Sequence, residues 1–427
     1  MLPIRLSRRY PVACVTVVVF LAIFLATPIH AAESPVPLAP SGIREALQNS
    51  WRQHPSFRAT EAQLAASNAR RDAAARPLYN PSMEFNVNDE GPDRTATAGI
   101  NLTLDLSGKR RVRREAAEAR VDQATAEARL TRRDFTRQWF AGWADLLTAI
   151  QRVGIGEQRL ALVDRFADLA DKQFAADDVS GLDRDLAALA RDEAQVQQSQ
   201  LEAEQADAQA RFQAVGGAID QTTSWELPTN ALPEPSAQQT GSREEQPGWQ
   251  VARSAALARS REVVVARRNR VADPTVGISG GRIDYGSFRD NVIGVSLSVP
   301  LFVRNSYGAE VIAAQADADA ADAEVEKVGL QLDVERERAI SNYESSRSAW
   351  TRWQASRGTD VERRASLLER LWKQGELSTA DYLLQLRQTL DTALAGAELE
   401  ARVWRSFVEY LAATGQLERW SGLEGTP

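Results

Sequence analysis

The sequence predicts a mixed α and β fold built as an internal duplication, in which long helices alternate with two pairs of short strands. Three observations support this prediction. Four landmarks recur at nearly constant spacing, short segments alternate between apolar and polar residues, and long alanine-rich stretches contain no proline. The chain has 427 residues, of which 43% are hydrophobic and 26% are charged, a balance that is typical of an ordered protein.

The duplication is indicated by landmarks that keep their order in both halves of the chain. The corresponding pairs are Pro55 and Pro247, Asn80-Pro81 and Asp273-Pro274, Leu106 and Leu301, and Asp178-Val179-Ser180 and Glu376-Leu377-Ser378, at offsets of 192, 193, 195 and 198 residues. Each half is therefore expected to contain a helix, two strands, a long helix, a turn and another helix. The predicted boundaries are a first repeat over residues 32–215, a proline-rich linker over 216–248, a second repeat over 249–415 and a C-terminal tail over 416–427, which loses the helical pattern.

Residues 1–31 are typical of a secretory signal peptide. Three arginines precede an apolar run over residues 12–26, and Ala31 provides a small residue at the expected cleavage site. The run is shorter than the roughly 20 residues of a membrane span, and an uncleaved anchor is the alternative. The only cysteine, Cys14, lies at the start of this run, so the mature chain is expected to lack disulfides and thiolate metal sites.

The charge balance bears on possible partners. Removal of the signal peptide takes away three arginines and no acid, which changes the formal net charge from −7 to −10. An acidic chain is a poor match for nucleic acid, whose phosphates attract basic surfaces. In a lumen this charge would favour cations over anions, and the alternative is that it serves solubility alone.

Two segments in each half show the two-residue periodicity of amphipathic strands. Residues 95–106 carry apolar side chains at even positions and polar ones at most odd positions, residues 83–88 alternate likewise, and Gly91-Pro92-Asp93 marks a turn. The second half repeats this over 276–278 and 294–301. Such patterning suits a soluble hairpin or a lipid-facing barrel strand. Because four strands cannot close a barrel, and the helices look too long to wrap them, closure between subunits is expected, with packing on helices of the same chain as the alternative.

The longest helix is expected from Ser107 to about Ala176, because this stretch contains no proline. At about 1.5 Å per residue it would reach about 100 Å. Gly154 and Gly156 lie within it, and a kink and a short break are the two interpretations considered for them. Two stripes at helical spacing are interpreted as helix packing, and they contain Trp139, Trp143, Leu146, Leu147 and Ile150, and Leu383, Leu386, Leu390 and Leu394.

No motif for catalysis, cofactor binding or metal binding is found. After the signal peptide, His54 is the only histidine, and the sequence contains no HExxH, CxxC, GxSxG or phosphate-loop pattern. The acidic residues between Asp177 and Asp183 do not have the spacing of a calcium loop. The chain is therefore predicted to be neither an enzyme nor a cofactor protein.

The densest basic cluster follows the first strand pair directly. It consists of Lys109, Arg110, Arg111, Arg113 and Arg114. Positive charge in the first turns of a helix opposes the helix dipole, so a role for it is expected. One interpretation is contact with lipid phosphates at a membrane edge, and the other is a solvated charged run.

Four stretches together, in order and duplicated, resemble the TolC-like outer-membrane efflux proteins. They are Leu78-Tyr79-Asn80-Pro81-Ser82, Ala272-Asp273-Pro274-Thr275, the VSLSVPL segment of residues 295–301, and the GELSTADYLLQL segment of residues 375–386. The resemblance covers about residues 41–415 and looks closest to the branch that serves cobalt-zinc-cadmium type heavy-metal pumps.

This resemblance implies a homotrimer in the outer membrane. Each subunit would give four strands to a shared twelve-stranded barrel and its helices to a periplasmic tunnel. The channel would dock through a periplasmic adaptor to an inner-membrane pump of the RND type and act as a passive duct for heavy-metal cations. The alternatives are a multidrug or type I secretion channel and, from a different class, a periplasmic coiled-coil scaffold without a pore.

The resemblance also implies site residues at the periplasmic helix tips. The residues expected to contact the adaptor are Ser180, Leu182, Asp183, Gly375 and Ser378, with Asp177 in place of the first tip's glycine. Trp372 and Asp381 match positions near the tunnel constriction, whereas Leu377 and Leu384 replace a basic and an acidic residue there, so a gate locked by salt bridges is not implied. Three copies of Asp381 would ring the pore; the alternative is that Asp381 caps a helix.

Overall fold

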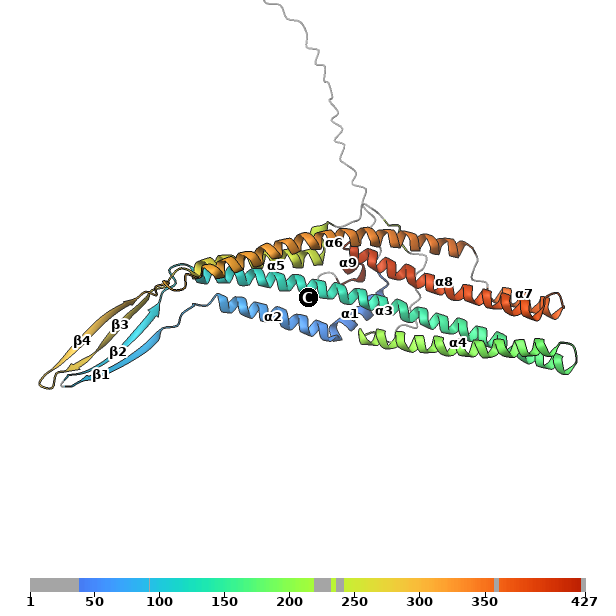
Figure 1. Ribbon diagram of the computed structural model, residues 1–427, viewed down its shortest axis with the longest axis horizontal. Helices are drawn as coiled ribbons and strands as arrows, with labels where there is room; N and C mark the ends of the chain where they lie inside the picture. Colours follow the sequence, from blue (N-terminus) through green and yellow to red (C-terminus); the bar gives the residue numbers. More distant parts are fainter. Residues whose placement is uncertain (1–37, 92, 219–231, 236–241, 357–360, 424–427) are drawn as a thin grey trace, which may run out of the picture. The chain divides into compact units, whose positions relative to one another are not determined.

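The computed structural model describes residues 38–91, 93–218, 232–235, 242–356 and 361–423 (Figure 1). All statements below concern these residues, which belong to the unit Val36–Pro427. The predicted signal peptide over 1–31, with Cys14, lies outside the described residues, as does most of the predicted linker over 216–248.

Helices form where alanine and straight-chain residues dominate, as the sequence predicts. They are α1 (Ser41–Gln53), α2 (Pro55–Ala74), α3 (Lys109–Ala175), α4 (Gly181–Ala214), α5 (Pro247–Asn269), α6 (Gly308–Ala355), α7 (Val361–Lys373), α8 (Thr379–Ala413) and α9 (Leu417–Ser421), with a 3-10 turn, η4 (Arg243–Glu245). Pro55 and Pro247 each occupy the first turn of a helix, where the missing N–H costs nothing. The tail after Gly415, which the sequence predicts to lose the helical pattern, contains the short helix α9.

Helix α3 runs unbroken for 67 residues, so the short break considered at Gly154 and Gly156 does not occur. Gly156 instead lies against α4, where an added Cβ would come within 2.7 Å of Leu201 Cδ1. The glycine lets the two helices approach closely, and this packing offsets its cost of about 1 kcal/mol in helix propensity.

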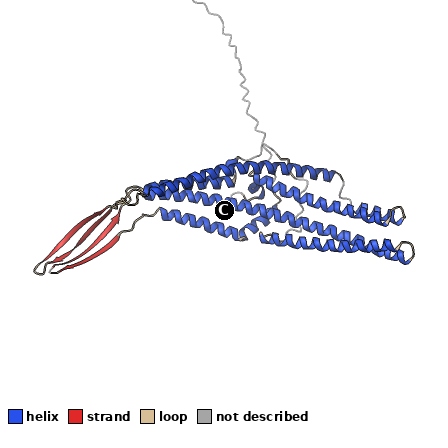
Figure 2. Ribbon diagram, viewed as in Figure 1, coloured by secondary structure: helices blue, strands red, loops and turns tan. Residues whose placement is uncertain are grey.

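The four predicted strands are confirmed and form one antiparallel sheet (Figure 2). They are β1 (Ser82–Glu90), β2 (Asp93–Thr103), β3 (Thr275–Asp284) and β4 (Arg289–Ser298), in the order β1-β2-β3-β4. β2 pairs with β3 from Arg94 opposite Asp284 to Thr103 opposite Thr275, so the two hairpins are joined within one chain. Strands β2 and β4 end earlier than predicted, because the chain turns toward α3 after Thr103 and Pro300 lacks the N–H that a ladder needs.

The sheet exposes its apolar face. Phe85, Ile293 and Val295 share this face, and they are 72%, 84% and 77% exposed. Packing of this face on helices of the same chain, the alternative left open by the sequence, does not occur among the described residues. The face therefore requires another apolar surface to cover it.

The helices bury two apolar clusters. One gathers aromatic residues of α3, α8 and α9, among them Trp139, Phe140 and Trp420. The other lies where α3, α7 and α8 meet and includes Phe166, Tyr382 and Leu390. Because Trp139, Trp143, Leu146, Leu386 and Leu390 all lie in these clusters, the interpretation of the stripes as helix packing is confirmed for them.

Left-handed backbone conformations recur at corresponding places in the two halves. The pairs are Gly91 and Gly286 in the hairpins, Gly108 and Tyr307 before α3 and α6, Asp177 and Gly375 in the helix turns, and Gly216 and Gly415 after α4 and α8, at offsets of 195, 199, 198 and 199 residues. Tyr307 and Asp177 adopt a conformation that normally favours glycine. The sequence showed the correspondence of Asp177 with Gly375, but not that of Tyr307 with Gly108.

Candidate functional site

The two helix turns at the tips share one backbone geometry. Asp177 has a φ of 59° and Gly375 a φ of 74°, both in the left-handed region. After each, a backbone N–H returns to the last helical turn: Asp178 N donates to Gln173 O at 2.8 Å, and Glu376 N donates to Leu371 O at 3.0 Å. These bonds satisfy carbonyls that a helix end otherwise leaves without partners.

The residue before the second helix of each tip is a serine that caps it. The Ser180 hydroxyl accepts a hydrogen bond from Asp183 N at 3.2 Å and donates one to Asp183 Oδ2 at 2.6 Å. Ser378 does the same for Asp381, at 3.1 and 2.6 Å. The pKa of Asp183 is lowered from its usual value, mainly because Ser180, and then Thr379, hydrogen-bond to its carboxylate. Both carboxylates therefore lie in the first turn of a helix, where the dipole favours negative charge.

The remaining predicted tip residues differ in accessibility. Leu182 is 69% exposed, which suits a surface that meets another protein. Trp372 is buried: its ring centroid lies 4.6 Å from that of Phe166, and its Nε1 donates to Thr379 Oγ1 at 3.2 Å. Trp372 thus joins α7 to α3 and α8 in this chain and does not present its ring at a surface.

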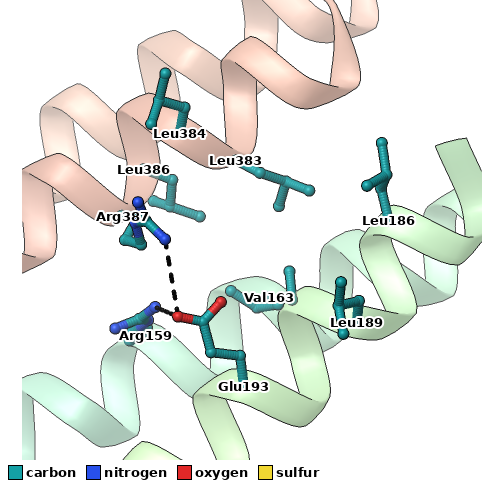
Figure 3. Close-up of a pocket in the computed structure, with 10 residues that line it drawn as sticks. Arg159, Val163, Leu186, Leu189, Glu193, Leu383, Leu384, Leu386 and Arg387 are labelled. Carbon is teal, nitrogen blue, oxygen red and sulfur yellow. Dashed lines mark ion pairs between the residues drawn. The ribbon is translucent and has the colours of Figure 1, made fainter.

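A groove separates the α3–α4 hairpin from α8 near the tips (Figure 3). Its apolar wall includes Leu186, Leu189, Leu383 and Leu384. Figure 3 shows the Glu193 carboxylate between the guanidinium groups of two arginines from α3 and α8.

The charged part of this groove was not predicted. The Arg159 side chain is only 7% exposed and lies 3.9 Å from Glu193 and 3.8 Å from Asp391, and Glu193 lies 3.9 Å from Arg387. A signal was present, because Arg159 falls between Gly156 and Val163 on the packed face of α3. A charged residue at such a position is rarely buried without partners.

The basic cluster divides where the strands meet α3. Lys109 is buried and pairs with Asp273 Oδ2 at 2.9 Å, and the same oxygen accepts a hydrogen bond from Tyr79 OH at 2.7 Å. That bond raises the pKa of Tyr79 to about 12. Asp105 caps α3 by accepting from the N–H groups of Lys109 and Arg110, both at 2.8 Å.

The other arginines of the cluster remain exposed. Arg110 and Arg113 are open to solvent, while Arg111 and Arg114 lie 3.9 and 3.4 Å from the glutamates one turn later. Lys109 therefore forms a buried salt bridge, whereas the four arginines of the cluster remain accessible at the base of the strands.

The described residues hold no cluster of three or more histidine, cysteine, aspartate or glutamate side chains suited to a metal ion. His54 caps α2, because its Nδ1 accepts a hydrogen bond from Ser56 N at 3.2 Å. Within the same residues, no helix is both long enough and apolar enough to cross a membrane.

The sequence is similar to curated metal-resistance proteins, although no protein-family model matches it. It is 29% identical to the cobalt-zinc-cadmium resistance protein CzcC of Cupriavidus metallidurans over 235 residues, which cover 54% of this chain and only 56% of that protein. It is 32% identical to the nickel and cobalt resistance protein CnrC of the same organism over 329 residues, covering 73% of this chain and 74% of that protein.

The fold is that of solved outer-membrane channels. The Campylobacter jejuni CmeC outer membrane channel superposes with a TM-score of 0.72 at 14% identity, covering 88% of this chain and 86% of that one. CusC superposes with a TM-score of 0.70 at 13% identity, covering 88% and 92%. At these identities the likeness concerns the fold alone.

Proposed function

Because this chain belongs to the TolC-like outer-membrane efflux proteins of heavy-metal resistance, we propose that it is the exit channel of a tripartite RND-type efflux system with heavy-metal cations as its cargo. Proteins of this family lie in the outer membrane with their helices in the periplasm. The chain supplies a passive duct and no catalysis. The energy and most of the choice of cargo belong to the inner-membrane pump.

The observation that carries this proposal is the sheet with an exposed apolar face, whose outer strands β1 and β4 each have one edge that no other described strand pairs with. In lipid, an unpaired strand edge is costly, because no water is present to bond its N–H and C=O groups. Three copies of the chain supply twelve strands, which close a barrel and remove every edge. The paired left-handed residues support an origin of the chain by duplication.

The helix tips are the proposed docking region for a periplasmic adaptor. Ser180, Asp183 and Ser378 fix the shape of the two turns, Gly375 provides the second turn's left-handed backbone, and Leu182 is exposed for contact. Asp381 keeps an exposed carboxylate. In a trimer, three copies of this carboxylate would ring the tunnel and attract cations.

The proposed cargo rests on the relatives and on charge. CzcC is named for resistance to cobalt, zinc and cadmium and CnrC for resistance to nickel and cobalt, and the predicted mature chain is acidic. The four exposed arginines that follow β2 lie where the strands meet the helices, and we assign them contact with lipid phosphates.

Deletion of the gene tests the cargo. The deletion strain and a complemented strain are grown against zinc, cobalt, cadmium, nickel and copper, and against dyes and antibiotics. Loss of metal tolerance that complementation restores is expected. Unchanged metal tolerance with lost dye tolerance would make this a multidrug channel instead. A protein that leaves the membrane fraction in high salt would point to the periplasmic scaffold.

A further inference from the structure

The outer strands of the sheet carry backbone groups that no strand of this chain bonds, and the hydrogen-bond pattern identifies them. Leu104 N donates to Pro274 O and Tyr285 N donates to Phe288 O, both at 2.9 Å. Hydrogen-bonded pairs alternate along antiparallel strands. Combined with the pairing registers, these two bonds show that the even-numbered residues of β1 and β4 hydrogen-bond to the inner strands β2 and β3. The N–H and C=O groups of the odd-numbered residues of β1 and β4 therefore point to the open edges of the sheet.

The open edge of β4 extends beyond its pairing with β3. That pairing ends at Ser298, yet Val299 and Leu301 continue the apolar alternation and are 48% and 78% exposed. Pro300 does not interrupt the open edge. As an even-numbered residue it faces β3, so its missing N–H ends the inner ladder only.

Barrel geometry limits how two copies can join. Strands tilt by about 35–45° in such barrels, with about 4.8 Å between strands and about 3.3 Å per residue. Around twelve strands this tilt displaces the register by roughly 12 to 18 residues, or roughly four to six at each of three subunit boundaries. The shift must be even, because an odd shift would turn apolar side chains into the lumen.

A junction between subunits without a register shift would continue each row of paired residues straight into the next subunit. Such a junction is therefore excluded, although it would bring opposite charges together. The row Asp89, Arg94, Asp284 and Arg289 crosses all four strands on one face, and Arg94–Asp89 and Arg289–Asp284 pair at 2.7 and 2.8 Å. Continued without a shift, the row would place Arg289 opposite Asp89 of the next copy. A barrel closed in that way would have untilted strands.

The direction of the shift follows from overlap and polarity. In one direction, a shift of four places Phe85 opposite Arg289, and only the first residues of β1 meet β4. In the other, Val87 lies opposite Val295 for a shift of four, or Leu297 for a shift of six. Met83, Phe85 and Val87 then oppose apolar residues of β4 or of its extension, and residues 299–301 gain a partner strand. The one charged side chain on this face of β1, Asp89, lies near the hairpin turn, opposite Ile293 or Val295.

We propose that β4 of one subunit, extended to Leu301, pairs with β1 of the next subunit with Val87 opposite Val295 or Leu297. This assignment rests on the proposed trimeric barrel and adds its register. Each boundary is then a continuation of the sheet, with odd-numbered residues of both strands exchanging backbone hydrogen bonds.

Disulfide trapping tests the register. In a Cys14→Ser background, three double variants combine Val87→Cys with Val295→Cys, Leu297→Cys or Asn291→Cys. The last is the matched control for the unshifted junction on the same face. Opposed residues have Cα atoms about 5.5 Å apart, within the range of a disulfide. The protein is oxidised in outer-membrane vesicles and run on denaturing gels without reductant, and its native mass is measured in detergent.

Covalent dimers and trimers with Val295→Cys or Leu297→Cys, in large excess over those with Asn291→Cys, are the expected result. A trimeric native mass with crosslinks only at Asn291→Cys, or with no crosslink in any variant, would overturn the register while leaving the trimer intact. A monomeric native mass would overturn the trimer as well, and the register with it.

Discussion

The buried salt bridge between Lys109 and Asp273 offers the sharpest energetic test of the fold, because it joins the bases of both hairpins to the start of α3. The two side chains are 10% and 3% exposed, and Asp273 also accepts the Tyr79 hydroxyl. Asp273→Ala leaves a buried ammonium without its partner. Such a loss costs about 3–5 kcal/mol, whereas replacement of both charges by apolar groups of similar size is often nearly neutral.

Hydrogen exchange in the trimer measures this cost where the strands meet the start of α3. Every 1.4 kcal/mol is a factor of ten, so we expect protection of the Lys109 and Arg110 amides to fall by at least roughly a hundredfold in Asp273→Ala. Most of the protection should return in the double variant Lys109→Met/Asp273→Leu. Asp72→Ala is the control, because the pair of Arg71 and Asp72 is exposed and worth about 0–1 kcal/mol. A loss below tenfold in Asp273→Ala, or a double variant worse than the single one, would refute the reasoning.

Four further residues give separate predictions. Asp177→Gly should stabilise the α3–α4 turn by about 1 kcal/mol, because a left-handed conformation costs other residues about that much; an unchanged or lower melting temperature would argue against it. Gly156→Val should destabilise the α3–α4 packing by about 1–3 kcal/mol, while Gly154→Ala, which meets no atom within 4 Å, should be neutral or stabilising in the same denaturation experiment. Asp381→Ala should lower cation selectivity in single-channel recordings without preventing assembly, and recordings equal to those of the wild type would count against a pore position. Because the folded-state pKa of Asp183 is lowered from 3.8, the stability that its carboxylate contributes is present above that pH and lost as the pH falls through the lower value; a carboxyl titration midpoint at or above 3.8 would contradict this.

Features set by local periodicity were predictable from the sequence. The alternation around Phe85 and Ile100 identified the strands, and the serines at 180 and 378 marked the tips. A helix break at Gly156 was one interpretation of the sequence, and it is wrong. The residue packs against Leu201, which is distant in the sequence, so the sequence alone does not show why a glycine is there. Propensity describes a helix in isolation, whereas packing decides what it tolerates.

Contacts between distant segments were beyond the reach of the sequence. Lys109 belongs to a run of similar basic residues, and only the tertiary structure distinguishes the one that is buried against Asp273. Trp372 was assigned to a constriction by analogy, and its packing against Phe166 depends on how α7 meets α3. Arg159 was passed over because the residues that neutralise it lie on α4 and α8.

The account as a whole depends on which side of each strand meets lipid. Spin labels placed singly at Phe85 and Asn86, and at Val295 and Ser296, are examined in lipid vesicles by their exposure to oxygen and to a water-soluble nickel complex. We predict that labels at 85 and 295 meet oxygen in lipid, whereas those at 86 and 296 meet nickel in water. Equal nickel exposure at all four positions would contradict the claim that these hairpins form the wall of a membrane channel.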